Sequence, residues 1–289
     1  MFQKIQRVGW AICVFLCGVL VAQAQQTMMS PPKVLVITRE ALKPGKYAVH
    51  EKWEAGWPRA FGKASWPVHY IAASSLTGEP RVLFMTGYES LAAWEKDNDN
   101  IAKNAGLAAE FAMLSEKDGD FLSEQKTAVF SYMPELSYHP EVSIAGTRYF
   151  GIFVVHVKPG HNEHFEAVRK TAAEAHAKAN LGDHYAVFHC VTGSSAGLYL
   201  VFIPMKSLAE LDQFSIVHGK AYQEALGEEG RKAIADFAMQ GQESSELQLF
   251  AFSPKMSYVG KDWVDADPAF WAPKPAAAKP MEKKEPAKK

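Results

Sequence analysis

Histidine is the residue type in this sequence that most readily suggests chemistry, and His218 is the strongest candidate. It lies in the segment SIVHGKAY, with Tyr222 about one helical turn further on. A neutral imidazole accepts a proton near neutral pH and also ligates iron, so His218 is a candidate catalytic base or axial ligand. We assign Tyr222 a ligand-binding role beside it. The alternative is a surface histidine whose ring nitrogens form hydrogen bonds within its own helix.

Two more histidines occupy equivalent positions, each followed by a tyrosine at the predicted start of a strand. These pairs are His69-Tyr70 and His184-Tyr185. If both imidazoles point into one cavity, then His69, His184 and Tyr185 bind a ligand near its mouth. The alternative is a His–Tyr pair at the edge of a strand that hydrogen-bonds loop groups.

Metal and thiol chemistry have less support. His161 and His164 have the i, i+3 spacing that places two imidazoles on one helix face, but the sequence contains no HExxH or CxxC motif to supply further ligands. We therefore predict no metal site. Cys190 lies in an apolar run and is predicted to be a small buried hydrophobe rather than a nucleophile.

Residues 1–24 are typical of a secretory signal peptide. Lys4 and Arg7 precede an apolar stretch, and Ala22-Gln23-Ala24 forms a small-x-small cleavage site. The sequence thus predicts a periplasmic or secreted protein with no transmembrane segment after cleavage. Only Cys190 would remain, so the mature protein would form no internal disulfide.

The opposite end, residues 261–289, is predicted to be a disordered Pro/Ala/Lys-rich tail. Its last 18 residues hold six lysines and two glutamates, while the whole chain has a formal net charge of -1. The body between leader and tail is therefore acidic. An acidic surface repels nucleic acid, so we expect no such partner and a monomer or weak homo-oligomer.

The body of the chain repeats itself. Sliding residues 37–85 onto residues 152–200 without a gap gives thirteen identities in forty-nine positions, where average composition gives about three. A Lys-Pro-Gly turn at 43–45 matches another at 158–160. We interpret residues 33–140 and 148–260 as two copies of one unit.

Each copy has the pattern strand, helix, strand, strand, helix, strand. In the second copy the predicted elements are 149–157, 161–178, 184–191, 198–203, 207–239 and 246–253. This order is that of a ferredoxin-like unit. Because the strands are apolar on both faces, helices must cover one side, and the sheet of the other copy is the simplest cover for the second. The predicted fold class is α+β, with two tandem ferredoxin-like repeats forming one barrel within a single chain.

The apolar first strand, the Lys-Pro-Gly turn and the Ser-Leu-Ala start of the second helix at 207–209 resemble the dimeric α+β barrel superfamily. The resemblance is to its NIPSNAP and antibiotic-biosynthesis-monooxygenase-like members, and it covers both repeats. In monooxygenase-like members a histidine on the second helix can face the barrel cavity, as His218 would here. The first copy has no histidine in this region, so the resemblance implies at most one such site.

Three functions remain open from the sequence. The first is an exported protein that binds a small apolar or aromatic molecule between its two sheets. The second is a monooxygenase-like enzyme that uses His218, either without a cofactor or with haem, which the resemblance allows. The third is a structural or interaction module without catalysis. We predict no cofactor for the first and third, and the sequence leaves open whether the protein is an enzyme.

Overall fold

The computed structural model describes residues 30–214 and 218–272, so the predicted signal peptide lies outside the described residues. The first half of the fold contains β1 (Val34–Leu42), α1 (Tyr47–Glu54), α2 (Gly56–Lys63), β2 (Tyr70–Ser75), β3 (Arg81–Tyr88), α3 (Leu91–Lys103), α4 (Ala105–Asp118) and β4 (Leu122–Tyr132). The second half contains β5 (Tyr149–Val157), α5 (Asn162–Lys178), β6 (Ala186–Thr192), β7 (Leu198–Met205), α6 (Ala209–Asp212), α7 (His218–Gln240) and β8 (Gln242–Phe252). Each half thus has the predicted order, and every predicted helical segment except the one that forms α5 is divided into two helices.

Local sequence explains where the helices divide. In the first half, α1 ends just before Ala55 and α2 begins at Gly56, with Pro58 in its first turn, where a missing N–H costs little. In the second half, the single helix predicted over 207–239 is replaced by α6 and α7. Within α7, Gly227 has a φ of 66° and interrupts the helical geometry, a conformation that glycine adopts readily.

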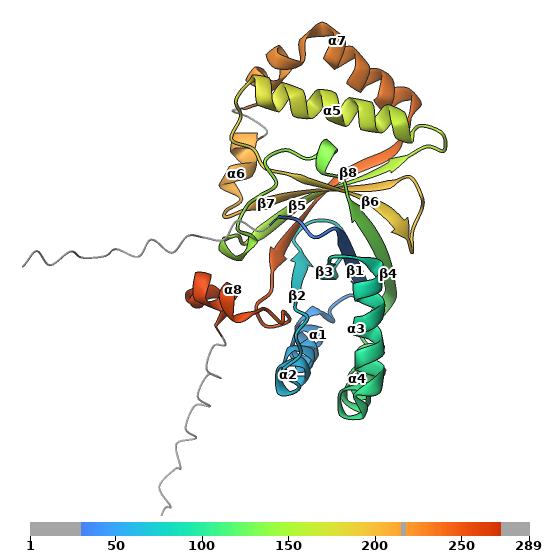
Figure 1. Ribbon diagram of the computed structural model, residues 1–289, viewed down its shortest axis with the longest axis vertical. Helices are drawn as coiled ribbons and strands as arrows, with labels where there is room; N and C mark the ends of the chain where they lie inside the picture. The colour runs from blue at the N-terminus through green and yellow to red at the C-terminus, as the bar shows by residue number, and fades with distance from the viewer. Residues whose placement is uncertain (1–29, 215–217, 273–289) are drawn as a thin grey trace, which may run out of the picture.

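The eight strands close into one barrel in the order β1-β3-β2-β8-β5-β7-β6-β4 (Figure 1). All neighbouring strands are antiparallel. The two halves join at β2–β8, where Ala73 pairs with Phe252, and at β4–β6, where Phe130 pairs with Cys190. The predicted α+β barrel within one chain is therefore confirmed.

Side chains alternate along the strands between two sides of the barrel wall. Those that point inward form an inner core, and those that point outward pack under the helices as an outer core that includes Val155, Tyr185 and Tyr199. The inner core draws on both halves and includes Leu35, Ile37, Leu83, Met85, Phe130, Phe150, Ile152, Phe188, Leu200, Phe202 and Phe250. The helices cover the outer faces, with α5 and α7 across the second half and α1 to α4 along the first (Figure 1). Burial of these apolar surfaces in two layers provides the main stabilisation. No helix within residues 30–214 or 218–272 is long and apolar enough to span a bilayer.

The prediction of a disordered tail that starts at residue 261 is wrong for residues 261–271. Residues 261–271 form two short helices, α8 (Lys261–Ala266) and α9 (Pro268–Trp271), that pack against the barrel. Trp271 is 4% exposed and its Nε1 donates a hydrogen bond to the carbonyl oxygen of Ala145 at 2.8 Å. Asp267 caps α9 and also pairs with Arg148. The aromatic side chains of this segment bury enough apolar area to order it, whereas residues 273–289 lie outside the described part of the chain.

Candidate functional site

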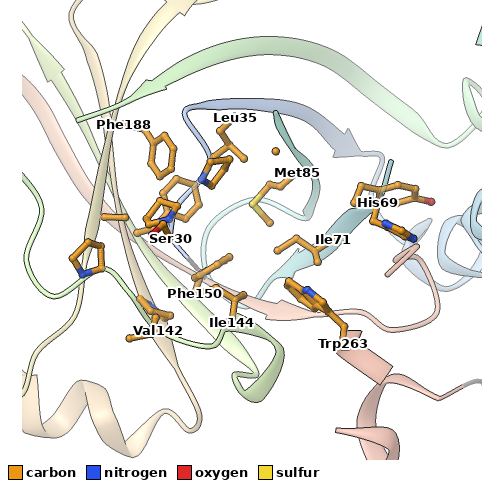
Figure 2. Close-up of a pocket in the computed structure, with 18 of the residues that line it drawn as sticks. Ser30, Leu35, His69, Ile71, Met85, Val142, Ile144, Phe150, Phe188 and Trp263 are labelled. Carbon is orange, nitrogen blue, oxygen red and sulfur yellow. The ribbon is translucent and has the colours of Figure 1, made fainter. Parts of the chain in front are cut away.

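A cavity of about 430 Å³ opens at one end of the barrel interior. Its wall consists of inward-facing apolar side chains from both halves, namely Leu35, Ile71, Met85, Phe150, Phe188 and Phe202 (Figure 2). Two aromatic contacts stiffen this wall, because Phe202 makes edge-to-face contacts with Phe150 and Phe188. A concave, apolar, preformed space of this size is typical of a site for a small molecule.

Three segments outside the strands surround the mouth of this cavity. They are residues 30–32, the linker residues 140–144 and residues 259–263, with Ile144 and Trp263 pointing toward the cavity in Figure 2. The segments come from the beginning, the middle and the end of the described chain. The mouth is therefore formed by segments that flank the strands of both halves.

His69 is a titratable side chain at the mouth of the cavity. Its ring stacks on Tyr258 with centroids 4.8 Å apart. Burial lowers the pKa of His69, although the nearby Asp262 carboxylate opposes this shift. The imidazole is therefore neutral at pH 7 and offers one donor and one acceptor to a ligand. Tyr88 also lines the cavity, but its hydroxyl already donates to Asp97 Oδ2 at 2.8 Å.

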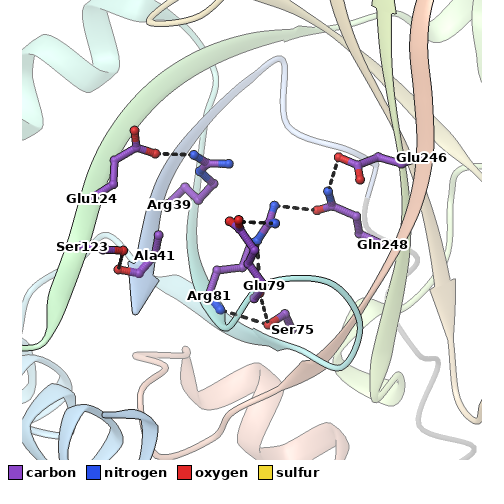
Figure 3. Close-up of polar contacts among 9 residues, drawn as sticks. All are labelled: Arg39, Ala41, Ser75, Glu79, Arg81, Ser123, Glu124, Glu246 and Gln248. Carbon is purple, nitrogen blue, oxygen red and sulfur yellow. Dashed lines mark hydrogen bonds and ion pairs between the residues drawn. The ribbon is translucent and has the colours of Figure 1, made fainter. Parts of the chain in front are cut away.

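Toward the other end, the inward-facing positions become polar (Figure 3). Arg81 Nη1 donates to Gln248 Oε1 at 3.1 Å, and Gln248 Nε2 donates to Glu246 Oε1 at 2.6 Å. Arg39 forms an ion pair with Glu124 on the neighbouring β4. These contacts connect both halves, so the interior has an apolar end with a cavity and a polar end cross-linked by hydrogen bonds.

His218 lies outside the barrel. Its Nδ1 is 2.7 Å from Asp183 Oδ1, and the Nε2 of His176 lies 3.5 Å from the other oxygen of the same carboxylate. It lines a second cavity, of about 550 Å³, together with Ile203 and Met205, which face the outer layer. The sequence analysis placed His218 toward the barrel interior. The position differs because α7 packs on the outer face of the second sheet.

The other predicted ligand-binding residues are divided between places. His69 and Tyr185 border the barrel cavity, but the Tyr185 ring lies in the outer core, 4.7 Å from the Arg169 guanidinium. His184 lines the second cavity with His218, and its Nδ1 is 2.9 Å from the His139 carbonyl oxygen. Tyr222 packs against His176, with ring centroids 4.6 Å apart. The structure thus brings His184 to His218 and leaves His69 at a different site.

Three residues were considered for metal or thiol chemistry, namely His161, His164 and Cys190. His161 precedes the first turn of α5, and its ring centroid is 6.1 Å from that of His164. Cys190 is 3% exposed in the inner core, and burial raises the pKa of its thiol. A buried thiol with a raised pKa is a poor nucleophile, in agreement with the prediction from sequence.

A buried cluster on the outer face of the first half was not predicted from the sequence. It consists of Glu40, His50, Glu54 and Asp118, and we call it the acid–histidine cluster. One nitrogen or oxygen from each residue lies within 4.8 Å of the others. The i, i+4 spacing of His50 and Glu54 was a sign of it in the sequence, but Asp118 is 64 residues further along the chain than Glu54 and could not be assigned without the fold.

Burial and mutual repulsion raise the pKa of two carboxyl groups in the acid–histidine cluster. Desolvation, followed by repulsion from Glu40, raises the pKa of Glu54 to about 9. The same two causes raise the pKa of Asp118 to about 6, with partial relief from His50. The cluster therefore holds negative charge only at a cost, unless a proton or a cation accompanies it.

The comparisons with known proteins identify the fold. The sequence matches no protein-family profile, and no curated protein matches it. A suggested monooxygenase from Fusobacterium nucleatum superposes with a TM-score of 0.53 at 10% identity, covering 78% of this chain and 94% of that one. An anthrone oxidase-like protein superposes with a TM-score of 0.52 at 13% identity, covering 79% and 94%. At these identities the likeness shows that the chain has the dimeric α+β barrel fold.

Proposed function

We propose that the protein binds a small apolar or aromatic molecule in the barrel cavity, outside the cytoplasm. The observation that carries this proposal is the cavity of about 430 Å³, open at one end of the barrel and lined by side chains of both halves. The proposed location follows from residues 1–24, which have the pattern of a signal peptide. Binding would remove the apolar wall and the apolar ligand from water together.

The polar groups around the cavity define the kind of ligand further. Neutral His69 lines the cavity together with the carboxyl groups of Glu89 and Asp262, and apolar side chains such as Phe150 and Phe188 form the wall of the barrel interior. A ligand with an aromatic or aliphatic body and one hydroxyl or carbonyl group at its outer end matches this arrangement. A charged group placed against the apolar wall would lose its hydration without a partner there.

We expect Ile71→Trp to abolish retention of the ligand. Ile71 is partly buried in the inner core and lines the cavity, so an indole at this position fills the space that a ligand would occupy. The measurement is native mass spectrometry of freshly purified protein, combined with titration of an environment-sensitive apolar dye. We expect dye affinity to fall by at least about tenfold, which corresponds to 1.4 kcal/mol.

Leu76→Trp is the matched control, because Leu76 is 50% exposed and lies outside the cavity. It adds the same indole without filling the barrel and is expected to bind like the native protein. Equal dye affinity in all three proteins would contradict binding in the barrel. Circular dichroism checks that Ile71→Trp retains the fold.

We propose oxygen-dependent catalysis as a second candidate function, because His218 and Asp183 form a dyad at the second cavity. The carboxylate accepts from Nδ1 and so leaves Nε2 as a base. The substrate class would be an anthrone, as the name of one structural neighbour suggests. Nε2 would take a proton from the carbon opposite the carbonyl, and the enolate would react with O2, giving one quinone and one water per anthrone and O2 consumed.

The surroundings of His218 do not fit a haem. The second cavity carries the carboxyl groups of Glu141, Asp183 and Glu210 beside Lys206, so an apolar porphyrin placed there would cut these groups off from water. The layer between the second sheet and α5 is filled, because the rings of Phe165 and Tyr199 lie 4.3 Å apart there. The reaction proposed for the His218–Asp183 dyad therefore uses no cofactor.

If the dyad is catalytic, His218→Gln is expected to lower kcat for anthrone oxidation by about 10²–10⁴-fold, the usual contribution of a general base. Oxygen consumption measures this rate. His164→Gln is the control, because His164 lies on α5 and does not line this cavity. Absence of oxygen uptake by the native protein would remove the enzymatic candidate and leave the binding proposal standing.

A further inference from the structure

We propose that the acid–histidine cluster binds one divalent transition-metal ion. The site lies between the first sheet and its helices, on the opposite side of the sheet from the barrel cavity. The inference is thus independent of ligand binding in the barrel and of the His218–Asp183 dyad.

Three elements bring the four donors together. Glu40 is on the outer face of β1, His50 and Glu54 are one turn apart on α1, and Asp118 ends α4. His50 Nε2 is 2.8 Å from Glu40 Oε2 and 3.4 Å from Asp118 Oδ1. When two donor atoms each lie about 2.0–2.2 Å from one metal ion, the distance between the two donors is at most about 4.4 Å. The observed spread of 4.8 Å therefore needs only small side-chain shifts to close around an ion.

Neighbouring donors hold the outer carboxylate oxygens. Gln125 Nε2 donates to Glu40 Oε1 at 2.8 Å, and Trp57 Nε1 donates to Glu54 Oε1 at 3.0 Å. Each of these bonds holds one oxygen of its carboxyl group, and the second oxygen of Glu40 faces His50 Nε2 at 2.8 Å, a contact that a bound ion would replace. Hydrogen bonds of this kind orient the ligands of protein metal sites.

One oxygen of the cluster lacks any hydrogen-bond partner within the described residues. It is Asp118 Oδ1, on a residue that is only 3% exposed, and it points toward the ring of His50. A buried carboxylate oxygen without a donor costs free energy. A metal ion among the four side chains would satisfy this oxygen and offset the repulsion among the three carboxylates.

The second half shows that the fold does not require polar residues here. Glu40 is the seventh residue of β1 and His50 the fourth of α1, while the seventh residue of β5 is Val155 and the fourth of α5 is Phe165. Val155 and Phe165 are both buried in an apolar outer core. The same architecture is thus packed with apolar side chains in one half and carries ionisable ones in the other.

The cluster is accessible from a third cavity, of about 630 Å³, lined by Glu40, Glu54 and Asp118. Tyr70 also lines it, and its buried hydroxyl has no hydrogen-bond partner in the described part of the chain. His50 lies beneath, fully buried. An ion could therefore enter from this side and keep one coordination position open toward the cavity, next to a free hydroxyl.

The donor set selects the class of metal. One imidazole nitrogen with three carboxylates and no thiolate suits Mn²⁺, Fe²⁺ or Zn²⁺. Ca²⁺ prefers six to eight oxygen donors, and Mg²⁺ retains most of its waters, so both are expected to bind more weakly here.

The test uses the full chain, stripped with a chelator and dialysed. Mn²⁺ and Zn²⁺ are titrated separately, with calorimetry for both and electron paramagnetic resonance for Mn²⁺. We expect one ion per chain and a melting temperature that rises with ion concentration, because an ion that binds only the folded state stabilises it. Glu54→Gln retains an acceptor for Trp57 but removes a charged ligand, and we expect it to weaken binding by about 100-fold.

Two control variants separate this site from surface binding. Glu124→Gln changes a carboxylate that borders the same cavity but pairs with Arg39, and His164→Gln changes the His161–His164 pair on α5. Both are expected to bind the ion like the native protein. No binding of either ion, or binding that Glu54→Gln leaves unchanged, would overturn the proposal. Ligand retention in the barrel is unaffected by either outcome, so the two proposals fail separately.

Discussion

Gly193→Ala is expected to lower the free energy of unfolding by about 3–5 kcal/mol, an effect reserved for substitutions that clash or strain the backbone. Gly193 has a φ of +85°, and a methyl group there would lie 2.2 Å from the Thr127 carbonyl oxygen and 2.7 Å from the Ala128 Cα. Both contacts are with the backbone of β4, which cannot move aside without opening the β4–β6 pairing. That pairing is one of the two joints that close the barrel.

Gly78→Ala tests whether the clash, rather than the backbone angle, is responsible. Gly78 occupies the corresponding turn of the first half, with a φ of +74°, and the nearest atom to an added methyl is 3.7 Å away on the Arg81 side chain. Only the positive φ then disfavours alanine, at about 1–2 kcal/mol. Denaturant titration followed by circular dichroism measures both variants. Equal losses would show that the barrel joint at Gly193 tolerates a side chain.

His50→Ala is expected to destabilise the metal-free protein by about 1–3 kcal/mol, because it leaves buried carboxyl groups without the hydrogen-bonding partner that the imidazole supplies. His50 is fully buried and its Nε2 contacts Glu40 at 2.8 Å, so its loss leaves three buried carboxyl groups around an empty space. Thermal and denaturant unfolding in the presence of a chelator measure the change.

The opposite sign is expected when three of the four cluster residues are replaced together, while Glu54 keeps its hydrogen bond from Trp57. A triple variant with Glu40→Val, His50→Phe and Asp118→Leu gives the first half an apolar layer like that of Val155 and Phe165. We expect its stability without metal to equal that of the native protein or to exceed it by about 1–4 kcal/mol. It should not respond to Mn²⁺ or Zn²⁺. A large loss of stability in the triple variant would mean that the cluster is needed for folding rather than for binding.

The sequence by itself determined the architecture. Two copies of a strand-helix-strand-strand-helix-strand pattern, each with strands apolar on both faces, predicted a sheet that needs a second sheet as its cover. The prediction was correct because strand alternation and the Lys-Pro-Gly turns are local properties of the chain. The identical burial pattern along β1 and β5 reflects the same regularity.

Tertiary structure alone decided which side chains meet. The direction of His218 depended on the face of the second sheet that α7 covers, and a helical periodicity does not distinguish the inside of a barrel from its outside. The helices at 261–271 form because Trp271 finds a site near Ala145, far away in the sequence. The acid–histidine cluster needs the end of α4 beside α1, and the distance between Asp118 and His50 is set by helix packing against the sheet. Such contacts arise from packing between distant segments, which no local pattern encodes.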